Sequence, residues 1–574
     1  MESTIYDVII VGGGTAGCIL AARLSEDPGL EVLVIEAGAD QLADPRVNVP
    51  ALWHTLLNGP ADWTFRTTPQ KYLEGRERPI PQGKLLGGSS AMNGLIFTPT
   101  PKSNVHAWTQ LGNPGWEWPS FSQSLGKVYS LAGRPNNGPL QLSFPDNSDN
   151  EWPQVWKDTL AGLDIPVTGD LLTGEANGLI VNPETVDPET KTRSHAGSVY
   201  LGPALSRGNL TVVTEATVEK ILFDKSNPAE VLAEGVQYTK AGETKVVRAR
   251  KEVVLAAGAI NSPKVLELSG IGDAGLLEKL GIDVVINNPN VGENLQDPVM
   301  CILSFEAKDG IKTLDPVARQ EPEAVAAAQE AYARLTGPLA TSGTSNTAQL
   351  PFPGIETDEG KRELDRLLDT LLNTKVDEDK PALLAAEANK NFVRSILASP
   401  EEASGCYITL PGYVGFDAAG AMVPPPPGKE GYFSIALLTT HPLSRGSTHI
   451  KSASAAVQDV DLDPHYFSHP LDLEIFARHL RHLETVLVAS SPLSDRLKPG
   501  GKRNPEAPSP GGFSDLDKAR EYARSTAMDA HHFVGTCSMM LPELGGVVDP
   551  QLRVYGTKNL RVCDASIISS DPAS

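Results

Sequence analysis

The sequence has few basic residues for its size and no apolar run long enough to cross a membrane. Its 574 residues include 49 Lys and Arg against 71 Asp and Glu, which gives a formal net charge of −22. A surface of this sign is unfavourable for nucleic acid or for an anionic membrane, so we expect neither as a partner. The chain is 40% hydrophobic, which is typical of a globular protein, and it is long enough for two or three packed domains.

Cysteine is also scarce. The chain has five: Cys18, Cys301, Cys406, Cys537 and Cys563. Their spacing matches neither a metal site nor a disulfide framework, so we expect mostly reduced, structural thiols and no bound metal. The first expected strand begins at Tyr6, which leaves no room for the basic and apolar regions of a signal peptide. These features favour a cytoplasmic protein, or a secreted one if a leader was removed.

What the sequence does have is a β-α-β pattern within its first 40 residues. An apolar run from Tyr6 to Val11 leads into a glycine-rich turn, a helix that extends through Leu24, and a second apolar run from Glu31 to Ile35. The pattern predicts a dinucleotide-binding domain at the start of the chain.

Three glycines in the turn VGGGTAGCILAARL fit a G-x-G-x-x-G frame: Gly12, Gly14 and Gly17. The first permits a tight turn, the second lets the backbone approach a pyrophosphate, and the third allows the helix and strand to pack closely. Glu36 ends the second strand, where a carboxylate can accept hydrogen bonds from both ribose hydroxyls and would repel a 2′-phosphate. The frame therefore disfavours NADP but leaves both NAD and FAD open.

The later segments alternate between sequence patterns typical of loops, strands and helices. Residues 51–150 are rich in Pro, Gly and Trp and are expected to form loops over a cofactor. Residues 210–223 predict a strand, followed by a hairpin near Gly242 and a buried strand. Residues 315–398 carry helical charge patterning, and residues 405–460 return to strand-like alternation, so this block looks like a separate domain.

Two further stretches distinguish FAD from NAD. GKLLGGSSAMNG, from Gly83 to Gly94, and GAINSPKVLELSGIG, from Gly258 to Gly272, resemble the two signature motifs of the glucose-methanol-choline (GMC) oxidoreductase family. The resemblance covers most of the chain in the right order. It continues through DWTFRT at Asp62, VGENLQD at Val291, SRGSTHIKS at Ser444, HFVGTCSM at His532, VVDPQLRVYG at Val547 and LRVCDAS at Leu560.

The stretch GGSS with Asn93 and Gly94 suits a loop pressed against a flavin, because small residues permit close approach while backbone N–H and hydroxyl groups donate hydrogen bonds. A plain Gly/Ser linker is the alternative, but a linker has no reason to occur beside the other motifs.

The resemblance implies an α/β fold: a Rossmann-like FAD-binding domain built from discontinuous segments, plus an α+β substrate or cap domain with an antiparallel sheet. The FAD-binding part would comprise residues 1–150 with flavin-covering loops, 191–310, and 526–574 with the catalytic histidine. The cap would comprise residues 151–190 and 311–525.

The resemblance also implies contacts to the cofactor. Thr15 and Ala16 would touch the pyrophosphate, and Glu36, with Ala37 beside it, the ribose. The remaining expected contacts are Ser89, Asn93, Gly94 and Ile96 at the flavin, the backbone of Val218 at the adenine, and Asp564 and Ala565 at the diphosphate and ribityl groups.

His532 occupies the histidine position of the H-x-V-G-T motif, which in this family is the catalytic acid or base. Its neighbour His531 is expected to point elsewhere. Imidazole has a reference pKa of about 6.5, which suits removal of a hydroxyl proton while hydride leaves the carbon for flavin N5. The expected activity is oxidation of a small-molecule alcohol to a carbonyl, with oxygen or another electron acceptor reoxidising the flavin.

The sequence departs from the family at several points. A second active-site residue, histidine or asparagine, would fall shortly after Asp564, at or beyond Ser574, so the chain is expected either to be truncated or to lack half of its catalytic pair. Smaller departures are Gln82, the pair Pro99 and Thr100, and Pro298. Two alternatives therefore stay open: a relative that keeps FAD for non-redox chemistry, such as a cyanohydrin lyase or a photodecarboxylase, and a non-catalytic scaffold.

Overall fold

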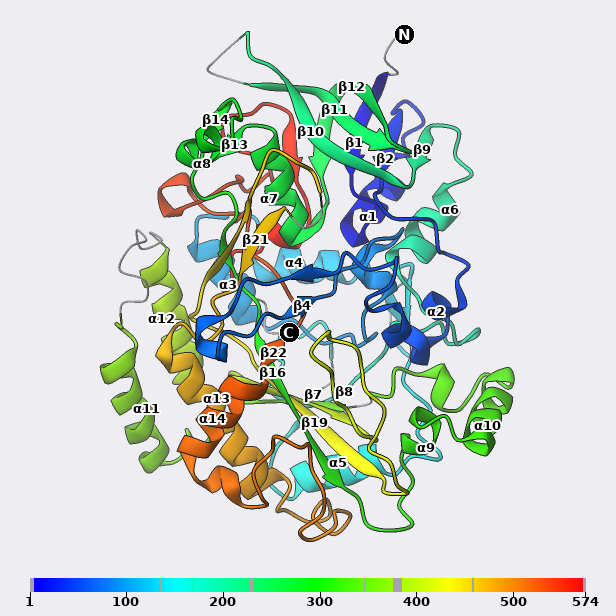
Figure 1. Cartoon of the computed structure of the whole chain (residues 1–574), viewed down its shortest axis with the longest axis vertical. Coiled ribbons are helices and arrows are strands. Elements are labelled where there is room, and N and C mark those ends of the chain that lie inside the picture. The colour runs from blue at the N-terminus through cyan, green and yellow to red at the C-terminus, as the bar shows by residue number, and fades with distance from the viewer. Residues whose placement is uncertain are drawn as a thin grey trace.

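Two seven-stranded sheets organise the chain, one in the upper and one in the lower part of Figure 1. The computed structural model describes residues 5–134, 137–168, 170–226, 231–344, 346–374, 385–456 and 459–570. The predicted α/β fold class, with one Rossmann-like and one antiparallel sheet, is confirmed.

The first sheet combines three distant stretches of chain. Its order is β10-β11-β12-β1-β2-β9, and β23 pairs with β12. The strands are β1 (Ile5–Val11), β2 (Val32–Ile35), β9 (Leu210–Val213), β10 (Ala216–Asp224), β11 (Leu232–Lys240), β12 (Glu243–Leu255) and β23 (Leu560–Val562). The pairs around β1 are parallel, whereas β10, β11 and β12 form an antiparallel meander.

The second sheet is antiparallel apart from its β7–β8 edge and has the order β22-β16-β19-β18-β17-β8-β7. The strands are β7 (Val167–Thr168), β8 (Gly178–Val181), β16 (Val299–Glu306), β17 (Asn346–Leu350), β18 (Gly405–Leu410), β19 (Tyr432–Thr439) and β22 (Met528–Asp529). Smaller sheets join β3 (Phe65–Arg66) to β4 (Pro79–Ile80), β5 (Tyr129–Leu131) to β6 (Leu140–Leu142), β13 (Ile271–Gly272) to β14 (Ile286–Asn287), and β15 (Glu293–Leu295) to β20 (Gly446–Ile450) and β21 (Val460–Asp463).

Helices cover both sheets. They are α1 (Thr15–Leu24), α2 (Pro45–Asn48), α3 (Lys102–Gln110), α4 (Trp118–Leu125), α5 (Trp152–Ala161), α6 (Gly202–Ala204), α7 (Gly258–Leu268), α8 (Ala274–Lys279), α9 (Asp315–Ala318), α10 (Pro322–Ala333), α11 (Asp358–Leu371), α12 (Ala386–Leu397), α13 (Pro470–His482) and α14 (Leu516–Thr526). No described helix combines the length and the apolar character needed to cross a bilayer. Among the described residues, no group of His, Cys, Asp and Glu side chains has the arrangement of a metal site.

The run of apolar residues in β1 follows from burial on both faces. Val8 and Ile10 pack in the core that contains α1, whereas Ile9 and Val11 pack in the core that contains the α7 residues Val265 and Leu266. A parallel strand covered on both sides has no polar face, so its sequence is continuously hydrophobic rather than alternating.

The second sheet is buried against aromatic residues. Trp152 of α5 stacks on Phe433 of β19 with ring centroids 4.4 Å apart, and both belong to the largest core cluster described. Helices α13 and α14 complete this core and lie beside each other in the lower part of Figure 1.

Two sequence-based expectations are corrected. Residues 102–110 and 118–125 form helices α3 and α4 rather than loops: Val105 and Trp108 lie three positions apart on one face of α3, and the Trp108 ring packs on the Phe121 ring of α4 with centroids 5.8 Å apart. The strand expected over 210–223 is two strands, because Glu215 adopts a left-handed backbone with φ of 53° and separates β9 from β10.

Some strands belong to a different sheet from the one that the expected domain boundaries imply. Strands β16 and β22 lie in the second sheet, although residues 191–310 and 526–574 were assigned to the FAD-binding part. Both are short segments next to motif residues, and local patterning cannot indicate which sheet a strand will join.

A buried ion-pair cluster ties α7 to the β15-β20-β21 sheet. His449 of β20 bonds through Nδ1 to Glu267 of α7 at 2.7 Å and through Nε2 to Glu293 of β15 at 3.1 Å. Glu267 is fully buried, and the Ile450 N–H donates to its second oxygen at 2.9 Å. Burial alone would lower the pKa of His449, but the two carboxylates outweigh it and raise that pKa to about 9.

We therefore predict an alkaline loss of stability that depends on His449. A raised pKa means that the contribution is fully present below the ordinary histidine pKa and is lost as the pH rises through about 9. At pH 7, His449→Gln should lower the free energy of unfolding by about 2 kcal/mol. Urea unfolding at pH 7 and pH 10 measures this. The prediction is wrong if the difference between wild type and variant is as large at pH 10 as at pH 7.

Candidate active site

The glycine turn is packed backbone against backbone. Gly12 has φ of 102°, and a Cβ on it would lie 2.5 Å from the carbonyl oxygen of Ala256, at the end of β12. A Cβ on Gly17 would overlap the carbonyl oxygen of Gly12. At Gly14 the nearest atom would be 3.8 Å from a Cβ, which is ordinary contact. The first and third glycines are thus required by the protein itself, whereas the second position has room for a methyl group.

Glu36 lies at the end of β2 and binds the same turn. Its two carboxylate oxygens accept hydrogen bonds from the N–H groups of Gly13 and Gly38, each at 2.7 Å. The residue is 5% exposed, and burial raises the pKa of its carboxyl to about 7 against the lowering effect of these bonds. Each oxygen keeps a further acceptor position for a ligand hydroxyl.

The loop from Gly83 to Gly94 lies against this turn. The Gly87 N–H donates to the carbonyl oxygen of Gly13 at 2.8 Å, and a Cβ on Gly88 would lie 2.7 Å from Cα of Gly14. Two motifs that are about 70 residues apart in sequence therefore touch through glycines.

Buried Arg193 holds the end of that loop. Its guanidinium donates to Oδ1 of Asn93 at 2.7 Å and to the carbonyl oxygen of Val47 at 2.9 Å. Arg193 is 2% exposed, so its hydrogen bonds orient the Asn93 amide within the protein. Sequence reasoning missed Arg193, since an arginine between two motifs gives no local sign of burial.

Asp564 connects the C-terminal strand β23 to the start of α7. Its Oδ2 accepts hydrogen bonds from the Gly258 N–H at 2.9 Å and from the Ser262 hydroxyl at 2.5 Å, and Oδ1 accepts one from the Ser566 N–H at 2.9 Å. A carboxylate at the N-terminus of a helix is stabilised by the free N–H groups there. The two motifs that contain Asp564 and Gly258 are thus joined.

The other residues predicted to contact the cofactor lie at several places in the fold. Ala16 and Ala37 are half-buried next to the turn and to Glu36. Ile96 forms an isolated bridge with Glu184. Val218 is a largely buried residue of β10, whose first residue, Ala216, donates its N–H to the Glu36 carbonyl oxygen at 2.9 Å.

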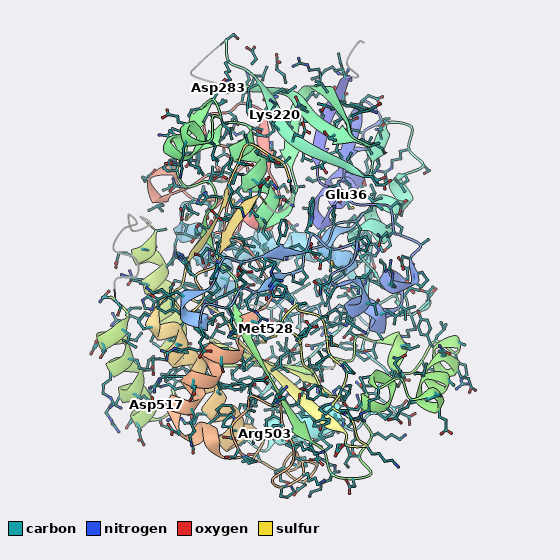
Figure 2. All side chains as sticks on the ribbon, in the orientation of Figure 1. Glu36, Lys220, Asp283, Arg503, Asp517 and Met528 are labelled. Atoms are coloured by element: carbon teal, nitrogen blue, oxygen red, sulfur yellow. The ribbon has the colours of Figure 1, made fainter. Side chains whose placement is uncertain are left out.

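Several predicted residues are exposed although their sequence neighbours are buried or half-buried. These are Thr15, Ser89, Asn93, His532 and Ala565. These accessible positions are where the motifs can contact a bound molecule. Glu36 is in the upper half of Figure 2, and Met528, which begins β22 at the edge of the second sheet four residues before His532, lies near its centre.

His532 follows β22 in a turn held by a buried carboxylate. Its N–H donates to Oδ1 of Asp297 at 2.7 Å, and its ring forms no hydrogen bond within the described part of the chain. Protein surrounds the ring, yet the residue remains accessible. This burial, with a smaller effect of His531, lowers the pKa of His532 to about 4, so the imidazole is neutral at physiological pH.

Sequence reasoning also missed Asp297 and Tyr466. Asp297 ends the motif VGENLQD, which indicated a special role for this stretch, but Tyr466 lies in no quoted motif. The Tyr466 hydroxyl donates to Asp297 at 2.5 Å. The position expected for a second active-site residue, at or beyond Ser574, lies outside the described residues.

These residues fit FAD. Gly14 needs no glycine for packing within the protein, Glu36 has free acceptor positions, and Thr15, Ser89 and Asn93 are accessible, as a site for a dinucleotide with a bulky ring system requires.

Comparisons with known proteins agree with this geometry. Residues 6–300 match the N-terminal part of the GMC oxidoreductase family, and residues 442–574 match its C-terminal part. A dehydrogenase of Monascus purpureus is 32% identical, over 98% of this chain and 92% of that protein. A GMC oxidoreductase family protein of Malassezia sympodialis is 32% identical, over 99% and 89% respectively.

Solved structures show the same fold. An FAD-dependent oxidoreductase from Chaetomium thermophilum has a TM-score of 0.87 at 26% identity, with coverage of 99% of this chain and 96% of that one. A fungal aryl-alcohol oxidase has a TM-score of 0.83 at 25% identity, with coverage of 100% and 96%.

The same alanine substitution should affect different properties at Gly14 and Gly17: FAD binding at Gly14 and apoprotein stability at Gly17. Gly14→Ala meets no protein atom closer than 3.8 Å, so the apoprotein should keep its thermal midpoint within about 2 °C while FAD binding weakens by about tenfold or more. Gly17→Ala collides with backbone and should destabilise the apoprotein itself. Thermal unfolding of the apoproteins and FAD titration measure both. Unchanged FAD affinity in Gly14→Ala would contradict the assignment of Gly14 to the cofactor site.

Proposed function

This chain belongs to the GMC oxidoreductase family and takes FAD as its cofactor, and from that premise we propose that it oxidises an alcohol CH–OH group to a carbonyl. The observation that carries the proposal is His532: a neutral, accessible imidazole in a turn whose backbone is held by buried Asp297. A general base must be unprotonated and must reach its substrate, and His532 meets both conditions.

The protein residues have distinct roles in this reaction. The substrate hydroxyl donates its proton to the free ring nitrogen of His532, and Asp297 fixes the turn that aims the ring. Bound FAD supplies the acceptor for the hydride that leaves the same carbon. Gly14, Thr15, Ala16 and Glu36 would hold the dinucleotide.

The flavin-facing residues form the other side of the proposed site. Ser89, Asn93, Gly94 and Ile96 would line the flavin, with Asn93 oriented by Arg193. Val218 would contact the adenine, and Ala37, Asp564 and Ala565 would complete the cofactor contacts.

The relatives support redox chemistry over the alternatives. Those described by activity are called dehydrogenases or oxidases, and the structural neighbours include an aryl-alcohol oxidase and a formate oxidase. We infer a small-molecule alcohol as the substrate and oxygen or another acceptor for the second half-reaction. Mixing the holoenzyme with a panel of alcohols under nitrogen, and then admitting air, tests both: an alcohol dehydrogenase or oxidase loses its visible flavin absorbance, whereas a lyase or scaffold keeps it.

Replacing His532 should remove the base and leave the cofactor in place. In His532→Asn, flavin should be retained because the backbone N–H to Asp297 is unchanged, while the anaerobic rate of flavin reduction should fall by about 10² to 10⁴. Stopped-flow absorbance measures the rate. His106→Asn, at an exposed position of α3, is the matched control and should reduce its flavin at the wild-type rate. Reduction by His532→Asn within about threefold of wild type would rule out His532 as the base.

A further inference from the structure

Two fully or nearly fully buried carboxylates lie behind the turn that carries His532. Asp297 is 5% exposed and accepts hydrogen bonds from the Tyr466 hydroxyl at 2.5 Å, the Ala530 N–H at 3.1 Å and the His532 N–H at 2.7 Å. Asp529 is 0% exposed and lies two residues before His531. Two acidic groups in such surroundings require either a proton or a nearby cation.

His531 supplies that cation from an unusual backbone conformation. Its φ is 67°, in the left-handed region that non-glycine residues rarely adopt, and its Nδ1 forms an ion pair with Oδ2 of Asp529. The His531 side chain is 33% exposed, so part of the ring remains accessible. The turn therefore directs the two neighbouring imidazoles into different environments: His531 has a carboxylate partner, and the ring of His532 has none among the described residues.

We propose that His531 is a positioning residue for the proton: by binding it beside Asp529, His531 adds to the effect of burial and helps to keep His532 in the neutral form that accepts the hydroxyl proton. This role rests on the proposed alcohol oxidation. The substrate O–H bond breaks, its proton moves to the His532 ring, and hydride leaves the carbon for the cofactor, so the base must start without a proton.

The surrounding charges favour this distribution. Burial acts to lower the pKa of His531, but the carboxylates of Asp529, Asp297 and Asp62 outweigh it and raise that pKa. Asp62 approaches from the loop that precedes β3. For His532, burial acts first and the neighbouring His531 cation second, and both lower its pKa. Two adjacent imidazoles do not both accept a proton readily, because the first repels the second.

The other charged groups around the cluster do not replace His531. Burial raises the pKa of Asp297 to about 7, and the charge of Asp529 adds to this, so an extra cation near the pair is favourable. The positive charge of Arg78 acts on Tyr466, the partner of Asp297. Without His531, the nearest imidazole that can offset the two carboxylates is His532 itself, and protonation would disable it as a base.

His531→Asn tests the proposal, because asparagine tolerates a left-handed backbone and carries no charge. In wild type, the anaerobic rate of flavin reduction should hold until the pH falls well below the ordinary histidine pKa. In His531→Asn the apparent pKa of the acid limb should rise by about one unit or more, while the rate at pH 9 stays within about threefold of wild type. His531→Lys keeps a cation at this position and should retain the wild-type profile.

Carbethoxylation of His532 by diethyl pyrocarbonate gives a second readout that does not need turnover. The reagent attacks the unprotonated ring, so peptide mass spectrometry of the holoenzyme across a pH series reports when His532 loses its proton. The midpoint should move upward in His531→Asn and should not move in His531→Lys or in the control His106→Asn.

The two readouts separate this inference from the proposed function. If no alcohol reduces the flavin but the modification midpoint shifts in His531→Asn, the control of His532 by His531 stands and the alcohol oxidation falls. If alcohols reduce the flavin and the midpoint is the same to within about 0.3 units in wild type and His531→Asn, the proposal for His531 is overturned.

Discussion

The candidate site depends on a contact in which backbone touches backbone with no side chain between. Gly17 packs on the Gly12 carbonyl, Gly12 on the carbonyl of Ala256, and Gly88 on Cα of Gly14. A methyl group at Gly12, Gly17 or Gly88 would force these segments apart. Through this contact, β1, the start of α1, the end of β12 and the loop 83–94 converge at one point.

Buried or half-buried carboxylates then hold the distant segments in place. Glu36, Asp297 and Asp564 each accept two backbone N–H bonds, so each fixes the path of a turn rather than simply pairing with a cation. Asp564 ties the last strand of the first sheet to α7, and Asp297 ties the β22 turn to β16. A carboxylate is costly to bury without hydrogen-bond donors. Each of these carboxylates therefore favours the loop conformation that supplies its donors over other conformations of the same loop.

Burial and ion pairing also give two neighbouring histidines different protonation states. His531 has a buried carboxylate within ion-pair distance, whereas His532 uses only its backbone N–H toward Asp297. Burial favours the neutral form of both rings, and the nearby carboxylates, Asp529 foremost, reverse that preference for His531. One position along the chain thus separates a charged residue from a neutral one.

Local sequence determined much of this protein. Gly12, Gly14 and Gly17 with Glu36 indicated a dinucleotide site because their spacing has a direct steric and hydrogen-bonding meaning, and the apolar runs predicted the first β-α-β unit. The sequence could not place β16 and β22 in the second sheet, separate the strands at Glu215 or identify helices α3 and α4. Nor could it reveal Arg193 beside Asn93, or Asp297 and Asp529 behind His532. The Arg193–Asn93 and Asp297–His532 contacts join residues that are 100 and 235 positions apart, and only folding brings such residues close enough for burial and charge to act.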